Sequence, residues 1–376
     1  MFPSGGQFRQ WHNGRMTTAC LSPNGVNTYD LPSAPDTLLV ATASGLARLR
    51  LDGGRWALME SRLNEMHPSS LVVEPGTEVI FAGIHNGGLF VSEDGGERWE
   101  RRTDGLTVEH VFSLRAIPGA ILAGTEPVSL FKSSDRGRSW TELPAIHRVA
   151  GMDKWTFPGP PHIAHTKTMT VDPRDPNRML VGVEQGALLS TTDGGQTWRE
   201  IDSYWTPDDR WYRDVHQLVR RPSNPDEIFM TSGMGFYHSD DGGQTWEHRT
   251  GLDWRIGYPD QLVFSPVDDR VVFMAGARHQ PGDWRRDSSA NAIVMKSTDA
   301  GSSWQEAGAG LPSPMTHNIE ALTVASYPGG YVLFAGDTGG NVYASDNEAT
   351  SWTLIVSGLG PVSKGGHYRA FQPAAA

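Results

Sequence analysis

The sequence predicts an all-β protein, a seven-bladed β-propeller of four-stranded antiparallel blades with Asp-box turns. First, the pattern Ser/Thr-x-Asp-x-Gly-x-x-Trp occurs five times, at Ser92–Trp99, Ser133–Trp140, Thr191–Trp198, Ser239–Trp246 and Ser297–Trp304. Second, two weaker copies extend the series, at Asp52–Trp56 and Ser345–Trp352. Third, the tryptophans of successive copies are 41 to 58 residues apart, which matches the period of propeller blades.

Each copy is interpreted as a tight turn that folds locally. Glycine permits a positive φ, the aspartate and serine side chains bind the turn's own backbone, and the tryptophan packs beside it. On these motifs the chain resembles the Asp-box (BNR repeat) propellers, a group that includes sialidases, xyloglucan-active glycosidases, sortilin-type receptors and photosystem II assembly factors. The resemblance covers nearly the whole chain. It implies a fold, and a structural role for the Asp-box aspartates, but no single function, because such propellers carry unrelated activities.

The repeat places one blade after another, each with strands A to D and the Asp box between strands C and D. In the fourth blade, alternation and β-branched residues predict strand A at 165–173, strand B at 178–184 and strand C at 187–191. One domain, residues 1–376, is expected, with approximate blades at 23–62, 63–106, 107–148, 162–203, 212–252, 256–311 and 315–358. A closing strand is expected within 359–376, where residues 364–371 could pair with residues 16–22 or displace them.

Composition restricts the partners. The net charge is −11 without a basic cluster, which argues against nucleic acid and anionic membranes as partners. No signal peptide or membrane-spanning stretch is recognised, so a cytoplasmic protein is expected. The single cysteine, Cys20, excludes an internal disulfide and is interpreted as a buried strand residue. The oligomeric state stays open.

Proline often ends strand A, so blades can be aligned by counting backwards from it. Eight residues before it stand His67, His110, His165, Asp214 and Tyr258, and Asn318 aligns with them in the seventh blade. Six residues before it stand Ser69, Phe112, Lys167, His216, Asp260 and Glu320. Side chains two apart on a strand share a face, so both tiers are expected at the mouth of the central channel. For any single histidine, a structural contact with the next blade is the alternative.

The residues that follow strand B can also be aligned between blades, and they are expected at the same end of the channel. An Ala-Gly-x or Val-Gly-x run after strand B is followed by His85, Glu126 and Glu184, and the loops between strands B and C emerge where strand A begins. Long insertions reach the same rim and contain the tryptophans that the repeat does not explain, namely Trp155, Trp205, Trp211, Trp254 and Trp284. Arg213 and Arg285 are candidate anion clamps. Aromatic anchors of folded loops and a protein-binding rim are the alternatives.

The leading hypothesis is an enzyme, a lyase or hydrolase that acts on a small polar, aromatic or sugar-like substrate at the channel mouth. Its candidate catalytic residues are Glu126, Glu184, His110, His165 and His216. Imidazole is a common metal ligand and often contacts a carboxylate. A Zn, Fe, Mn or Cu ion on His67, His110, His165 and His216 is therefore one expectation, and a metal-free acid–base site is the other. Substrate binding is assigned to His67, His85, Lys167, Trp155, Trp205, Trp211, Arg213, Tyr258, Asp260, Trp284, Arg285, Asn318 and Glu320.

Two alternatives stay open. The resemblance implies glycoside hydrolysis, which needs two carboxyl groups facing a sugar, and the candidates are Glu126 and Glu184 with Asp260 or Glu320. The arginine triad of sialidases cannot be assigned in this chain. The other alternative is a propeller without catalysis that serves protein recognition or assembly.

Overall fold

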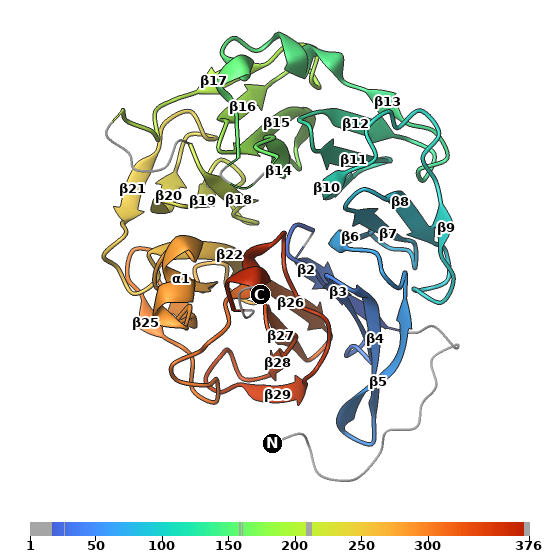
Figure 1. The fold of residues 1–376 in the computed structure, drawn as a ribbon, viewed down its shortest axis with the longest axis vertical. Helices are drawn as coiled ribbons and strands as arrows, with labels where there is room; N and C mark the ends of the chain where they lie inside the picture. The colour runs from blue at the N-terminus through green and yellow to red at the C-terminus, as the bar shows by residue number, and fades with distance from the viewer. Residues whose placement is uncertain (1–16, 26, 158, 160, 208–212, 372–376) are drawn as a thin grey trace, which may run out of the picture.

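The computed structural model describes residues 17–25, 27–157, 159, 161–207 and 213–371. Seven β-sheets form a closed ring around a central channel, as Figure 1 shows. The predicted fold is confirmed, and almost all of the described regular structure is β-strand.

Blades two to six each have four antiparallel strands that follow one another outward from the channel. Their strands are β6 (Pro68–Val73), β7 (Ile80–Ile84), β8 (Gly88–Ser92) and β9 (Glu100–Arg101); β10 (Val111–Ile117), β11 (Ala120–Thr125), β12 (Leu130–Ser133) and β13 (Thr141–Glu142); β14 (His165–Asp172), β15 (Asp175–Glu184), β16 (Ala187–Thr191) and β17 (Arg199–Ile201); β18 (Val215–Arg220), β19 (Ile228–Ser232), β20 (Gly235–Ser239) and β21 (Glu247–Thr250); β22 (Tyr258–Phe264), β23 (Val272–Ala277), β24 (Ile293–Ser297) and β25 (Gln305–Glu306).

The N-terminal strands close the ring. In blade one, β1 (Thr18–Leu21) pairs in parallel with β3 (Thr37–Thr42), which is followed outward by β4 (Gly45–Asp52) and β5 (Arg55–Arg62). In blade seven, β2 (Thr28–Asp30) pairs in parallel with β26 (Ile319–Tyr327), which is followed by β27 (Gly330–Asp337), β28 (Val342–Ser345) and β29 (Thr353–Val356). One segment thus joins the first blade to the last.

This closure corrects the expected closing strand within 359–376. The described part of that segment ends in a 3-10 helix, η3 (His367–Phe371), and contains no strand. The reason is that Ser363 and the Lys364 backbone bind the buried carboxylate of Glu320, so their polar groups are satisfied inside the channel instead of along a sheet edge. The innermost strand of blade one is accordingly Thr18–Leu21, outside the expected range 23–62.

The Asp boxes lie between strands C and D, as predicted. In blade five, the Ser239 hydroxyl accepts the Gly243 amide at 2.9 Å and donates to Asp241 at 2.8 Å, and Asp241 accepts the Thr245 amide at 3.0 Å. The seventh copy keeps this pattern with Asn347 at the aspartate position. The first copy, at Asp52–Trp56, is a short hairpin that turns on two glycines with positive φ.

Repeated glycines in strand B let successive blades approach closely at the channel. A Cβ on Gly182 would lie 2.6 Å from Val215 of the next blade, and a Cβ on Gly124 would lie 2.5 Å from Thr166. No side chain larger than hydrogen fits there without movement. The residue two positions after the glycine is thereby brought against the first strand of the following blade.

Two of the insertions contain short helices. These are η1 (Pro144–Arg148) and η2 (Met152–Lys154) before blade four, and α1 (Pro281–Asp287) between β23 and β24. The red C-terminal segment runs back toward the middle of the ring (Figure 1), where η3 contacts α1. Cys20 is fully buried in β1, as predicted, and burial raises the pKa of its thiol to about 12.

Candidate functional site

The channel mouth is built by the same β-bulge in six blades. The register of the first long strand shifts between Pro68 and Ser70 in blade two and at the equivalent place in blades three to seven. The residues left unpaired by these shifts are Ser69, Phe112, Lys167, His216, Asp260 and Glu320. This is the second tier that the proline count identified. A bulge re-aims the side chain of the extra residue, so a repeated bulge builds a ring of side chains at the channel.

A cavity of about 930 Å³ opens at this mouth. Its lining includes His67, His110 and His165 of the first tier, His85 and Glu126 from the loops after strand B, and the C-terminal residues 364–369. This volume falls near the upper end of the range of small-molecule sites, roughly 300–1,000 Å³. The cavity is therefore large enough for a substrate of several rings.

A continuous chain of imidazoles and carboxylates lines one wall of the cavity. His85 Nδ1 lies 2.8 Å from His110 Nε2, and His110 Nδ1 lies 3.2 Å from Glu126 Oε1. The other oxygen of Glu126 lies 3.1 Å from His165 Nδ1, and His165 Nε2 lies 2.7 Å from Glu184 Oε2. Glu126 thus lies beside His110 and Glu184 beside His165, as expected if the loops between strands B and C emerge where strand A begins. The ring of His67 stacks on that of His85, with centroids 4.2 Å apart.

Hydrogen bonds and burial set the charges along this wall. Burial would raise the pKa of Glu126, but hydrogen bonds from His110 and His165 lower it to about 2. Burial would lower the pKa of His165, but its two carboxylate partners raise it. Burial lowers the pKa of His85 well below its usual value, and the neighbouring histidines add to the effect. The wall therefore holds an ionised Glu126 between groups that can exchange protons.

The C-terminal segment supplies counter-charges that the sequence hypothesis did not include. The ammonium group of Lys364 forms a buried ion pair with Asp260, and the Asn318 amide donates to the second Asp260 oxygen at 2.6 Å. His367 Nδ1 donates to Glu320 Oε1 at 2.9 Å. Residues 364–371 belong to the expected closing strand, and the only sequence signal for this different role is that two buried carboxylates need partners.

A second group of acidic and imidazole side chains lies deeper, between blades four and five. One ligand atom each from Glu184, Asp214 and His216 lies within 4.8 Å of the others. Lys167 Nζ lies 3.4 Å from Glu184 Oε2, and burial lowers the pKa of Lys167 to about 8. The four histidines expected to share a metal do not form one such group among the described residues, because His67 and His110 bind Ser363 and Glu126 instead.

The rim tryptophans act as loop anchors in the described structure. Trp284 is fully buried, donates to the His279 carbonyl at 2.7 Å and stacks on Phe371. Trp155 is 9% exposed and packs at Gly186. Trp205 lies under the Arg213 guanidinium, which pairs with Glu200, and Trp254 packs on Trp304. None of these four lines the channel cavity, and Trp211 lies outside the described residues.

Of the other predicted binding residues, some line the cavity and others are buried below it or hold a loop. Tyr258 and His85 line the cavity, whereas Lys167, Asp260, Asn318 and Glu320 lie beneath its surface. Arg285 donates to the Arg369 carbonyl at 3.2 Å and holds the C-terminal segment. Phe157 and Tyr368 line the cavity and were not predicted, because they lie in segments without the repeat.

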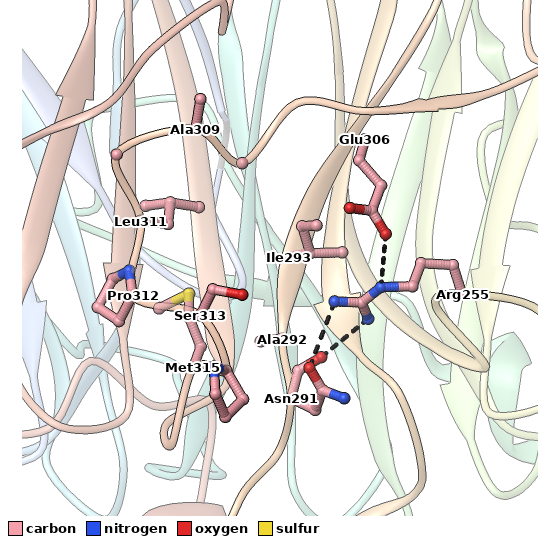
Figure 2. Close-up of a pocket in the computed structure, with 13 residues that line it drawn as sticks. Arg255, Asn291, Ala292, Ile293, Glu306, Ala309, Leu311, Pro312, Ser313 and Met315 are labelled. Atoms are coloured by element: carbon pink, nitrogen blue, oxygen red, sulfur yellow. Dashed lines mark hydrogen bonds and ion pairs between the residues drawn. The ribbon is translucent and has the colours of Figure 1, made fainter.

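A second hollow, of about 440 Å³, lies in blade six (Figure 2). Its one arginine, Arg255, already donates to Glu306 at 3.0 Å and to the Asn291 carbonyl at 3.0 Å. The remaining lining comes mainly from residues 308–315. It holds no cluster of proton-transfer groups among the described residues, so the channel mouth is the stronger candidate site.

Comparison with known proteins supports the repeat and the fold. The model of the BNR/Asp-box repeat matches residues 237–248, which is the turn of blade five. Together with the seven-sheet ring, this match identifies the architecture. The chain is a seven-bladed Asp-box propeller.

Curated relatives of this propeller are xyloglucanases of low identity. An oligoxyloglucan-reducing end-specific xyloglucanase of Emericella nidulans is 24% identical over 64% of the chain and 32% of the relative. A xyloglucanase of Paenibacillus sp. is 23% identical over 64% of the chain and 26% of the relative. The propeller thus spans about a third or less of the length of these relatives.

Solved structures match the fold. An ancestral GH74 enzyme superposes with a TM-score of 0.59 at 19% identity, over 76% of this chain and 38% of the enzyme. YCF48 bound to D1 peptide superposes with a TM-score of 0.51 at 15% identity, over 86% of both chains. At such identities the likeness concerns the fold alone. In the described part of the chain, the helices are all too short to span a membrane.

Proposed function

We propose that this propeller is a hydrolase of carbohydrate or similarly polar substrates and that the reaction takes place in the channel-mouth cavity. The observation that carries the proposal is a pair of carboxylate–imidazole dyads in one cavity. Glu126 with His110 forms the first dyad, and Glu320 with His367 forms the second. The side chains of Glu126, His110 and His367 are 15%, 13% and 17% exposed, so each can be reached from the cavity. The xyloglucanase relatives support the choice of substrate class.

Hydrolysis needs a base that takes a proton from water and an acid that protonates the leaving oxygen. In the first dyad, His110 directs its Nδ1–H toward the ionised Glu126, which fixes the orientation of the ring. His110 Nε2 lies 2.8 Å from His85 Nδ1, so we assign activation of water to the dyad together with His85, which takes a proton from water at Nε2 and passes its Nδ1 proton to His110. In the second dyad, Glu320 orients His367 in the same way from the other side of the channel. We assign protonation of the leaving group to His367.

The structure argues against the simplest glycosidase arrangement, in which a sugar binds between Glu126 and Glu184. The imidazole of His165 occupies the space between these two carboxylates. Phe112 stacks on that imidazole with ring centroids 3.7 Å apart, so no sugar ring fits there. Glu184 is better placed to hold His165 than to contact a substrate. We therefore include Glu126, and not the pair, among the catalytic residues.

The test is hydrolysis of xyloglucan oligosaccharides and a panel of chromogenic glycosides by the wild-type protein, Glu126→Gln and His367→Gln. Loss of a proton-transfer group costs on the order of 10²–10⁴ in kcat, so each variant should lose at least about 100-fold in kcat with a small change in KM. His248→Gln is the matched control, because His248 lies on outer strand β21. Full activity of both site variants on a substrate that the wild type cleaves would contradict the proposal.

A further inference from the structure

The deeper group beneath the cavity consists of three buried side chains from two neighbouring blades. Glu184 ends β15, Asp214 precedes β18, and His216 occupies the bulge of β18. The three residues are 3%, 5% and 3% exposed. One ligand atom of each lies within 4.8 Å of the others. Two carboxylates at this separation in a buried place repel each other strongly unless positive charge lies between them.

The hydrogen bond of His216 determines which of its nitrogens faces the carboxylates. Nδ1 lies 2.7 Å from the carbonyl oxygen of Pro259. A carbonyl only accepts, so Nδ1 carries the hydrogen. In neutral His216, Nε2 then presents a lone pair, and this atom lies 3.4 Å from Asp214 Oδ2 without a hydrogen bond in the described structure. Metal-binding histidines characteristically donate their second nitrogen to a backbone carbonyl or a carboxylate in this way.

Besides the unpaired Nε2 of His216, the carboxylate of Asp214 is a second observation that favours a bound cation. Its Oδ1 is buried and has no hydrogen-bond partner among the described residues. A buried carboxylate without partners is costly. The two ammonium groups of the channel compensate other carboxylates, because Lys364 pairs with Asp260 and Lys167 lies beside Glu184. Among the described residues, neither ammonium group forms an ion pair with Asp214.

We propose that Glu184, Asp214 and His216 bind one divalent first-row transition-metal ion. One imidazole and two carboxylates are ligands that suit Zn²⁺, Mn²⁺ and Fe²⁺. Glu184 and Asp214 also line the cavity, so the remaining coordination positions face the space that a substrate would occupy. This site differs from the expected four-histidine site, of which it keeps only His216. It is independent of the hydrolase proposal, although a metal there would add Lewis-acid activation of water to it.

The experiment measures metal binding and needs no substrate. The full chain is purified without an affinity tag, stripped with a chelator and titrated with Mn²⁺ by EPR and with Zn²⁺ by calorimetry. One equivalent should bind to the wild type, and Asp214→Asn and His216→Gln should each weaken binding at least about tenfold. The matched controls His67→Gln and His110→Gln remove channel histidines outside the triad and should bind as the wild type does.

Three results of these titrations would overturn the proposal. The wild type could bind neither ion at millimolar concentration, or Asp214→Asn and His216→Gln could bind as well as the wild type. Alternatively, His67→Gln and His110→Gln could lose binding, which would assign the metal to the four-histidine set. Pulsed EPR of the Cu²⁺-loaded wild type gives an answer even if a variant does not fold. It should detect one coordinated imidazole, and several imidazoles would contradict the triad.

Discussion

The Asp-box turns and the channel mouth both contain hydrogen-bonded carboxylates. In the turns the partners are neighbours in the sequence, whereas at the channel mouth they come from distant segments. Asp241 binds the backbone and hydroxyl of Thr245 and the hydroxyl of Ser239, all within four residues. At the channel mouth, Asp260 pairs with Lys364, 104 residues away, and Glu126 contacts His165 in the next blade. One arrangement is complete within a turn, and the other exists only after the ring has closed.

In both arrangements, hydrogen bonds keep a carboxylate ionised against the effect of burial. Burial would raise the pKa of Asp241, but hydrogen bonds from Thr245 and Ser239 lower it to about 2. The pKa of Glu126 is also about 2, for the corresponding reason with partners from other strands. The difference therefore lies in what a mutation disturbs. A change in the turn should stay local, whereas a change at the channel should reach the whole ring.

The largest expected effect comes from Lys364→Met, which leaves the buried Asp260 carboxylate without its counter-charge. Breaking a buried ion pair from one side costs about 3–5 kcal/mol, and the free energy of unfolding should fall by that amount in urea denaturation. The double variant Asp260→Asn, Lys364→Met should recover part of the loss, because no unpaired charge remains. A loss below about 1 kcal/mol would show that the C-terminal segment does not stabilise the channel.

A smaller effect is expected from Ser239→Ala, which removes a buried hydroxyl from a single Asp box. The Gly243 amide loses one hydrogen bond, and Asp241 loses one at its carboxylate and a longer one at its backbone amide, so the expected loss is about 1–2 kcal/mol. Hydrogen exchange should increase mainly in residues 239–246. If instead protection fell in several blades, as expected for Lys364→Met, the distinction between the two regions would fail.

The smallest effect concerns pH. Because the pKa of His165 is raised on folding, its protonation stabilises the protein fully below the unfolded value near 6.5, and this contribution is lost as pH rises through the folded value. In Glu126→Gln one of its two carboxylate partners is gone, so the fall in stability as pH rises above about 6.5 should become shallower. Ser239→Ala should keep the wild-type slope. Urea unfolding at several pH values measures both, and equal slopes in all three proteins would exclude His165 as the source.

The repeat made part of the site predictable. Counting back from proline identified His67, His110 and His165, and also the residues of the second tier, because the same bulge recurs in six blades. The Gly-x-Glu runs led to Glu126 and Glu184, because a glycine that packs against the next blade fixes the position of the residue two later. In both cases a local pattern and a global position are linked by the regular geometry of the ring.

The remaining features lie where the repeat is absent. The tryptophans of the insertions were interpreted as binding residues from their number, but Trp284 is enclosed by Phe371 and by its own loop. Residues 364–371 are expected to add a strand, but Lys364 and His367 bind buried carboxylates instead. Sequence spacing carries no information about such contacts, because the partners belong to unrelated segments.

The sequence by itself determined the seven blades, the position of each Asp-box turn and the tiers of side chains at the channel, since all three depend on interactions within about one repeat. The tertiary structure alone decided that N-terminal strands close the ring, that Lys364 pairs with Asp260 and His367 with Glu320, and that Glu184, Asp214 and His216 meet. The physical reason is that burial of a charge must be compensated by whichever group the closed ring brings within a few ångströms, however far away that group lies in the sequence.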